Sequence, residues 1–163
     1  MRVGAPAESV KIWVAGRTGR GRAATPENAP LMSGALRRVL VADDDPTILT
    51  LVKAVLKSGP YEVVTCGDAE SALVCLGTEP PFDVIISDFM LPGLSGLEFV
   101  TKLRLSERTA QMPILMMSGH TNYAMEERAL AAGANLFLHK PFTLSELRIA
   151  VKNLSEGAYK QPA

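Results

Sequence analysis

Five short apolar runs recur along the chain, and they constrain its fold more than any other feature. The runs are RVLVA, YEVVT, DVIIS, PILMM and NLFLH, at residues 38–42, 61–65, 83–87, 113–117 and 135–139. Segments with helical periodicity lie between them and after the last run. Strands that alternate with helices form a parallel sheet with helices on both faces, and nearly all-apolar strands are typical of burial on both sides. The sequence therefore predicts an α/β fold: a doubly wound, five-stranded parallel sheet of the (βα)5 type.

The predicted helices are marked by apolar stripes and by capping residues. The first stripe runs from Ile48 to Leu56. Asp45 stands directly before Pro46, the pattern of an N-cap followed by proline at the first helical position. We therefore expect Asp45 to be a helix cap rather than a ligand. Further helix ends are indicated by two capping-box patterns and one glycine: Ser95 with Glu98, Thr143 with Glu146, and Gly133.

Residues 1–36 differ from the rest of the chain. The stretch RTGRGRAATPENAP is rich in Gly, Pro and Arg and has no apolar period, so we predict a flexible basic tail. A basic arm that contacts a partner and a start site at Met32 are the alternatives for this segment. We expect one domain over residues 37–155, followed by a short C-terminal tail over 156–163.

Composition excludes several functional classes. The formal net charge is zero, from 17 basic and 17 acidic residues, so there is no bulk attraction to nucleic acid or to anionic membranes. No apolar run reaches transmembrane length, and the N-terminus lacks the apolar segment of a signal peptide. Cys66 and Cys75 lack metal-site spacing, so we expect two small buried side chains in a reducing cytosol. These features predict a cytoplasmic protein without direct DNA or membrane binding.

Polar residues follow four of the five predicted strands. In doubly wound sheets, ligands bind outside the carboxyl ends of the strands. The residues that follow the first, third, fourth and fifth runs are, in that order, Asp43 to Asp45; Asp88; Ser118, Gly119 and His120; and Lys140. Crowded carboxylates repel one another, and a divalent cation such as Mg²⁺ offsets that cost. A carboxylate beside a metal ion, a hydroxyl and an ammonium group is also a good phosphoryl acceptor.

The segments VLVADDDP, VIISDFMLPGLSGLE, PILMMSG and GANLFLHKPF, with the closing helix, resemble the receiver domain of bacterial two-component response regulators. The resemblance covers about residues 37–155 and implies a flavodoxin-like fold. It implies that Asp88 is the phosphoacceptor. It also implies that Asp43, Asp44, Asp88 and the backbone carbonyl of Met90 hold Mg²⁺ or Mn²⁺.

The same resemblance assigns roles to residues after the fourth and fifth strands. Ser118 and Lys140 would bind phosphoryl oxygens, and Phe137 occupies the aromatic switch position. The bond between Lys140 and Pro141 is expected to be cis, as only bonds to proline commonly are.

Two further positions are expected to set the lifetime of the phosphoryl group. Met90 and His120 lie two residues beyond Asp88 and Ser118. The apolar Met90 side chain cannot orient an attacking water, so we expect slower loss of the phosphoryl group than in Met90→Asn. The direction of any effect of His120 stays open.

The resemblance implies a phosphorylation-dependent signalling switch rather than an enzyme, apart from its own phosphoryl transfer and autodephosphorylation. A sensor histidine kinase or a histidine phosphotransfer protein would supply the phosphoryl group. The output would be protein–protein interaction through the face made by the fourth helix, fifth strand and fifth helix. No output module follows the last helix, so we expect a stand-alone receiver. Whether the domain forms a homodimer is left open.

Two alternatives belong to other functional classes. Residues 43–47 also match the DxDxT pattern of haloacid-dehalogenase-like phosphatases, in which Asp43 would be the nucleophile. Chain order argues against this, because that family places an acidic pair after its lysine and none follows Lys140. The second alternative is a receiver-like interaction module that is never phosphorylated. The presence of Asp88 and of the acidic pair argues against it.

Overall fold

The computed structural model describes residues 36–120 and 123–159 of the 163-residue chain. Of the predicted tail over residues 1–36, only Leu36 lies within this range. Most of the predicted C-terminal tail, residues 156–159, is described and residues 160–163 are not. The basic tail and its alternatives therefore stay predictions.

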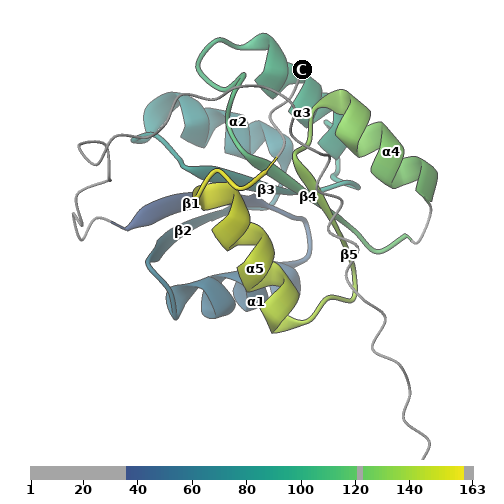
Figure 1. Cartoon of the computed structure of the whole chain (residues 1–163). Coiled ribbons are helices and arrows are strands. Elements are labelled where there is room, and N and C mark those ends of the chain that lie inside the picture. Colours follow the sequence, from purple (N-terminus) through teal and green to yellow (C-terminus); the bar gives the residue numbers. More distant parts are fainter. Residues whose placement is uncertain (1–35, 121–122, 160–163) are drawn as a thin grey trace, which may run out of the picture. The chain divides into compact units, whose positions relative to one another are not determined.

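Five parallel strands alternate with five helices in the described residues (Figure 1). The sheet has the strand order β2-β1-β3-β4-β5. This arrangement confirms the predicted flavodoxin-like (βα)5 fold. The elements are β1 (Arg37–Ala42), α1 (Pro46–Lys57), β2 (Tyr61–Cys66), α2 (Ala69–Thr78), β3 (Val84–Asp88), α3 (Gly96–Leu105), β4 (Ile114–Ser118), α4 (Tyr123–Ala132), β5 (Leu136–His139) and α5 (Leu144–Ser155).

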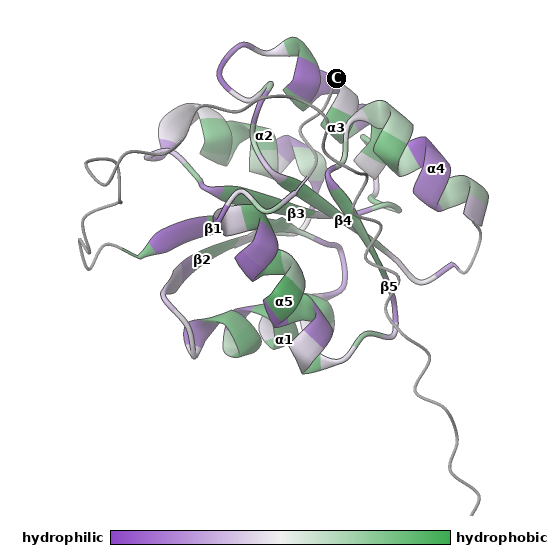
Figure 2. Ribbon diagram, in the orientation of Figure 1, coloured by the Kyte–Doolittle hydropathy of each residue, from purple (hydrophilic) through white to green (hydrophobic). Residues whose placement is uncertain are grey.

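Two apolar layers hold the helices against the sheet. α1 and α5 cover one face, and α2, α3 and α4 cover the other (Figure 1). Alternation along β1 supplies both layers, because Leu40 and Ala42 pack toward α2–α4 while Val39 and Val41 pack toward α1 and α5. Figure 2 shows β3 and β4 as mostly hydrophobic, and their polar residues stand at the carboxyl ends. The core therefore needs apolar residues at consecutive positions of the central strands.

The edge strands depart from the expected burial on both faces. Every residue of β3 and β4 is buried, and so is β1 from Val39 onward. β5 is only half-buried throughout, and β2 has one buried residue, Cys66. The prediction was wrong for these two strands because the strand order places them at the edges, where each pairs on one side only.

Local hydrogen bonds define the helix ends as predicted. The Asp45 carboxylate caps α1 by accepting from the backbone N–H of Thr47 at 2.8 Å. Both capping boxes form, at the start of α3 and of α5. Gly133 follows α4 with a φ of +112°, a conformation that favours glycine. No helix of the described residues is both long and apolar enough to cross a membrane.

The two cysteines lie side by side, with 3.6 Å between their Sγ atoms. Cys66 at the end of β2 is buried, whereas Cys75 on α2 is only partly buried. The expectation of full burial was therefore wrong for Cys75, which lies on an exposed helix next to an edge strand. Burial, with the hydrogen bond to Cys75, raises the pKa of the Cys66 thiol to about 12.

Candidate functional site

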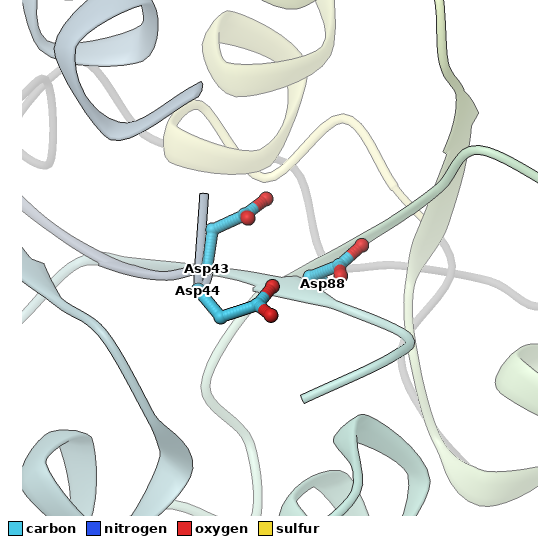
Figure 3. Close-up of side chains that lie close together, drawn as sticks. All are labelled: Asp43, Asp44 and Asp88. Atoms are coloured by element: carbon cyan, nitrogen blue, oxygen red, sulfur yellow. The ribbon is translucent and has the colours of Figure 1, made fainter. Parts of the chain in front are cut away.

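The site lies at the carboxyl ends of β1 and β3, the two strands between which the winding of the sheet reverses. Asp43 and Asp44 directly follow β1, and Asp88 is the last residue of β3. One carboxylate oxygen from each lies within 4.8 Å of the others (Figure 3). Asp45 is turned to the helix cap instead and is not in this cluster. The cluster thus contains the three predicted aspartates.

The three carboxylates differ in burial and in bonding. Asp43 is completely buried, Asp88 is 6% exposed and Asp44 is exposed. Asp43 Oδ1 accepts from the backbone N–H of Asp45 at 2.9 Å. Its own backbone N–H donates to the carbonyl of Cys66 at the end of β2, at 3.1 Å. These bonds hold Asp43 in place as the most constrained acid of the cluster.

Lys140 reaches the cluster from the residue after β5. Its Nζ donates to Asp43 Oδ2 at 2.8 Å and to Asp88 Oδ1 at 3.2 Å. Burial by itself would lower the pKa of the Lys140 ammonium group, but the bond to Asp43 and the charge of Asp88 outweigh it and raise that pKa. Lys140 is therefore cationic at neutral pH and neutralises part of the acidic charge.

One ammonium group does not balance three carboxylates. Burial raises the pKa of Asp88, and the charges of Asp43 and Asp44 raise it further, although Lys140 opposes them. The cluster thus favours additional positive charge. Its donors are carboxylate oxygens, which suit Mg²⁺ and Mn²⁺, and the exposed Asp44 leaves one side open to solvent. The residues present therefore fit a hard divalent cation.

Ser118 ends β4, the strand next to β3, and is 1% exposed. Its Oγ accepts from the backbone N–H of His120 at 3.2 Å. Its carbonyl accepts from the backbone N–H of Lys140 at 2.7 Å. The hydroxyl and the ammonium group thus belong to neighbouring strand ends joined by a direct backbone bond.

The sequence profile of the response regulator receiver domain family matches residues 39–152. The chain belongs to this family. It is 36% identical over 116 residues to the alkaline phosphatase synthesis transcriptional regulatory protein PhoP of Bacillus subtilis, covering 71% of the chain and 47% of that protein. The chain spans about half the length of the first curated relatives it matches.

Solved structures of receivers superpose on the same region. The chemotaxis response regulator CheY4 of Vibrio cholerae matches with a TM-score of 0.69 and 33% identity, over 74% of this chain and 99% of that one. The receiver domain of the sensor histidine kinase PA1611 of Pseudomonas aeruginosa matches with a TM-score of 0.69 and 28% identity, over 75% and 99%. The latter structure has a magnesium ion coordinated in its active-site cleft. Family membership identifies the chain as a signalling receiver rather than a conventional enzyme, and does not favour the two alternatives.

The remaining predicted residues lie after β3 and β4 and on or after β5. Met90 and His120 each come two residues after the end of a strand, and their side chains are exposed. Phe137 of β5 is half-buried on the side of the sheet covered by α2–α4. The Lys140–Pro141 peptide bond is cis.

Sequence reasoning missed Gly96, the first residue of α3. A Cβ atom at this position would lie 2.1 Å from the carbonyl oxygen of Asp88, so only glycine lets α3 begin against the end of β3. The Gly96 backbone N–H donates to the carbonyl of Phe89 at 3.1 Å, which anchors the loop after Asp88. A poor helix former at the first helical position was the available signal.

Proposed function

We propose that this receiver is a phosphorylation-dependent signalling switch whose phosphoacceptor is Asp88. The observation that carries the proposal is the different bonding of the two buried carboxylates. Both oxygens of Asp43 are engaged, by the Asp45 backbone and by Lys140. Asp88 bonds Lys140 through Oδ1, and no hydrogen bond to its Oδ2 is made within the described residues. Asp88 therefore keeps one oxygen that accepts no hydrogen bond from the described residues, whereas each oxygen of Asp43 accepts one.

The transfer needs no reactant besides Asp88 and the phosphoryl donor. A lone pair of Asp88 Oδ2 forms the new bond to phosphorus. The bond from phosphorus to the donor breaks, and the leaving group keeps its electron pair. The atom that leaves phosphorus is a histidine nitrogen of a kinase or phosphotransfer protein, or the bridging oxygen of acetyl phosphate, which departs as acetate. The incoming phosphoryl oxygens need positive or donor partners, and Ser118 and Lys140 supply a hydroxyl and an ammonium group.

Mg²⁺ or Mn²⁺ completes the proposed site. Asp43, Asp44, Asp88 and the Met90 backbone carbonyl would hold it. When bound, it neutralises the acidic cluster and the phosphoryl oxygens. The shortage of positive charge around Asp88 supports this, as does the magnesium ion in the PA1611 receiver.

The output is proposed to arise from two conformations. Phosphorylation adds nearly two negative charges, which draw Ser118 and Lys140 toward the phosphoryl group. Phe137 then turns toward the space behind Ser118 and alters the face made by α4, β5 and α5. Large apolar side chains are exposed on the helices of that face and suit a protein partner: Tyr123, Leu130, Leu144 and Ile149. We place this exchange in the cytoplasm, with a histidine kinase or phosphotransfer protein upstream.

Intact mass after incubation with acetyl phosphate and Mg²⁺ tests the proposal. The parent chain is expected to gain one phosphoryl group, and a chelator or Asp88→Ala should prevent the gain. Asp83→Ala is the matched control, because Asp83 is exposed at the opposite ends of the strands. A gain that survives in Asp88→Ala but not in Asp43→Ala would indicate the phosphatase-like chemistry. No gain in any variant would favour an interaction module that is not phosphorylated.

A further inference from the structure

We propose that His139 is a positioning residue of the switch: its hydrogen bond to Glu126 ties β5 to α4 and holds Phe137 in its resting place. This inference rests on the proposed function and deepens it. Within the described residues, neither His139 nor Glu126 hydrogen-bonds any of the three carboxylates.

His139 contacts three parts of the switch at once. Its Nε2 lies 3.2 Å from Oε2 of Glu126 on α4. Its ring packs edge-on against Phe137, with 4.9 Å between centroids and an angle of 64° between planes. In the sheet it pairs with Ser118, and Lys140 is the next residue along the chain. A movement of Phe137 or of the strand end therefore has to involve this ring.

Hydrogen bonding assigns the proton of the neutral ring. His139 Nδ1 is buried and has no hydrogen-bond partner among the described residues. A carboxylate can only accept a hydrogen bond, so in the neutral ring Nε2 carries the proton and donates to Glu126. Glu126 is thus the polar group that orients the ring.

α4 is lightly held apart from this contact. Only Ala129 of α4 is fully buried, whereas α5 buries Leu147, Val151 and Leu154. At the other end of α4, Arg104 donates to the carbonyl of Gly133 at 2.7 and 2.9 Å. The bond from His139 to Glu126 therefore adds a polar tie between β5 and the first half of a helix that buries little apolar surface.

The expected direction follows from the arrangement in which the contact exists. The bond to Glu126 is made in the arrangement in which Lys140 bonds both Asp43 and Asp88, and we take this arrangement as the resting state. An interaction specific to the resting state opposes the phosphoryl-bound state, and by linkage it weakens binding of a phosphoryl group or its analogue. Both partners are about 40% exposed, so screening keeps the effect small. We expect roughly a two- to fivefold change in affinity.

Beryllofluoride, which binds a carboxylate oxygen as a phosphoryl group does, is the probe. Its Kd is measured at saturating Mg²⁺ for the parent, Glu126→Ala and Glu127→Ala, because alanine removes the acceptor and keeps helix propensity. Glu127 is the matched control, because it is exposed and neighbours Glu126 on the same helix. Glu126→Ala is expected to lower the Kd about two- to fivefold, and Glu127→Ala to leave it unchanged. The thermal midpoint without ligand checks that each variant is folded.

The same substitution made in a Phe137→Ala chain distinguishes a positioning role of His139 from general destabilisation. If His139 acts through Phe137, Glu126→Ala should no longer lower the Kd in a Phe137→Ala chain, whereas a purely structural role would leave the shift intact. An equal or higher Kd in Glu126→Ala overturns this inference while the proposed function stands, provided that the parent binds beryllofluoride. If the parent neither binds beryllofluoride nor gains a phosphoryl group, both proposals fail.

Discussion

A cluster of three acidic residues and one basic residue lies at each end of the central strands, and the two clusters are arranged in opposite ways. At the amino ends, Arg38 bonds Glu62 at 3.3 Å and Glu79 at 2.6 Å, and its backbone N–H donates to Asp83 at 2.7 Å. Its guanidinium also lies over the ring of Phe82, 4.4 Å from the centroid. Each acidic group there bonds a different donor of one residue.

At the carboxyl ends, the carboxylates converge on one another. The side chains of Glu62 and Glu79 are 53% and 34% exposed, so water screens them, whereas Asp43 is completely buried. Lys140 bonds two of the three converging acids, and the pKa of Asp88 stays raised. Both clusters contain three acidic residues, so the number of charges does not distinguish them. The carboxyl-end cluster favours an added cation because its carboxylates are close together and partly buried.

Removing each cation should give the largest contrast between the clusters. Lys140→Met leaves the buried Asp43 charge unpaired, and we expect it to lower the free energy of unfolding by about 3 kcal/mol at neutral pH without metal. Arg38→Met acts on partners that water screens, because the Glu62 side chain is exposed and the Glu79 side chain is partly exposed, and it should cost about 1 kcal/mol. Urea denaturation in the presence of a chelator measures both. A greater loss in Arg38→Met would contradict the comparison.

Adding a divalent cation should stabilise only the carboxyl-end cluster. At a Mg²⁺ concentration ten times the Kd, the gain is about 1.4 kcal/mol, which corresponds to roughly 5 °C in the unfolding midpoint. Asp44→Asn should lose most of this gain, and Glu62→Gln should keep it. A midpoint that does not respond to Mg²⁺, or a response lost in Glu62→Gln, would show that the cation binds elsewhere or not at all.

Neutralising one acidic residue should raise the stability of the folded chain at the carboxyl ends of the strands and lower it at the amino ends. Because the pKa of Asp88 is raised in the folded chain, ionisation of this carboxyl lowers stability. That cost is absent at a pH below the ordinary aspartate range, where the group is protonated in both states. It grows as the pH rises and is complete above the raised pKa.

Asp88→Asn is therefore expected to raise the unfolding midpoint at neutral pH, and the difference from the parent should shrink as the pH falls through the carboxyl range. Asp83→Asn weakens the bond to the Arg38 backbone and should lower the midpoint. Unfolding midpoints measured against pH without metal check both signs. A midpoint of Asp88→Asn below that of the parent at neutral pH would mean that the Lys140 contact outweighs burial.

The smallest expected effect concerns rate rather than stability. The exposed Met90 side chain has no hydrogen-bonding group, whereas an asparagine there can orient a water molecule toward the phosphoryl group. Met90→Asn should therefore lose the phosphoryl group several-fold faster, about the value of one hydrogen bond. Intact mass followed over time after removal of acetyl phosphate measures the decay. Equal decay rates would refute the role given to this position.

Much of the molecule could be predicted from local pattern. Strand and helix types follow from periodicity, and the caps at Asp45, Ser95 and Thr143 depend on hydrogen bonds that span three residues or fewer. The gathering of Asp43 and Asp88 followed from one rule, that parallel strands present their carboxyl ends together. The caps and the choice of sheet edge need no knowledge of which strands are neighbours, whereas the closeness of Asp43 and Asp88 also required β1 to pair with β3.

Long-range pairing decided the rest. Strand order alone made β2 and β5 the half-buried edges, although their sequences resemble those of the central strands. Lys140 bonds a carboxylate 97 residues away, and His139 reaches α4 across the turn between them. The sequence by itself determined the elements and the end of the sheet that carries the chemistry, because these depend on periodicity and neighbouring residues. Tertiary structure decided which carboxylate is buried, which one keeps an oxygen without a hydrogen bond among the described residues and which residue contacts Phe137. These features depend on distances between segments that are remote in the chain.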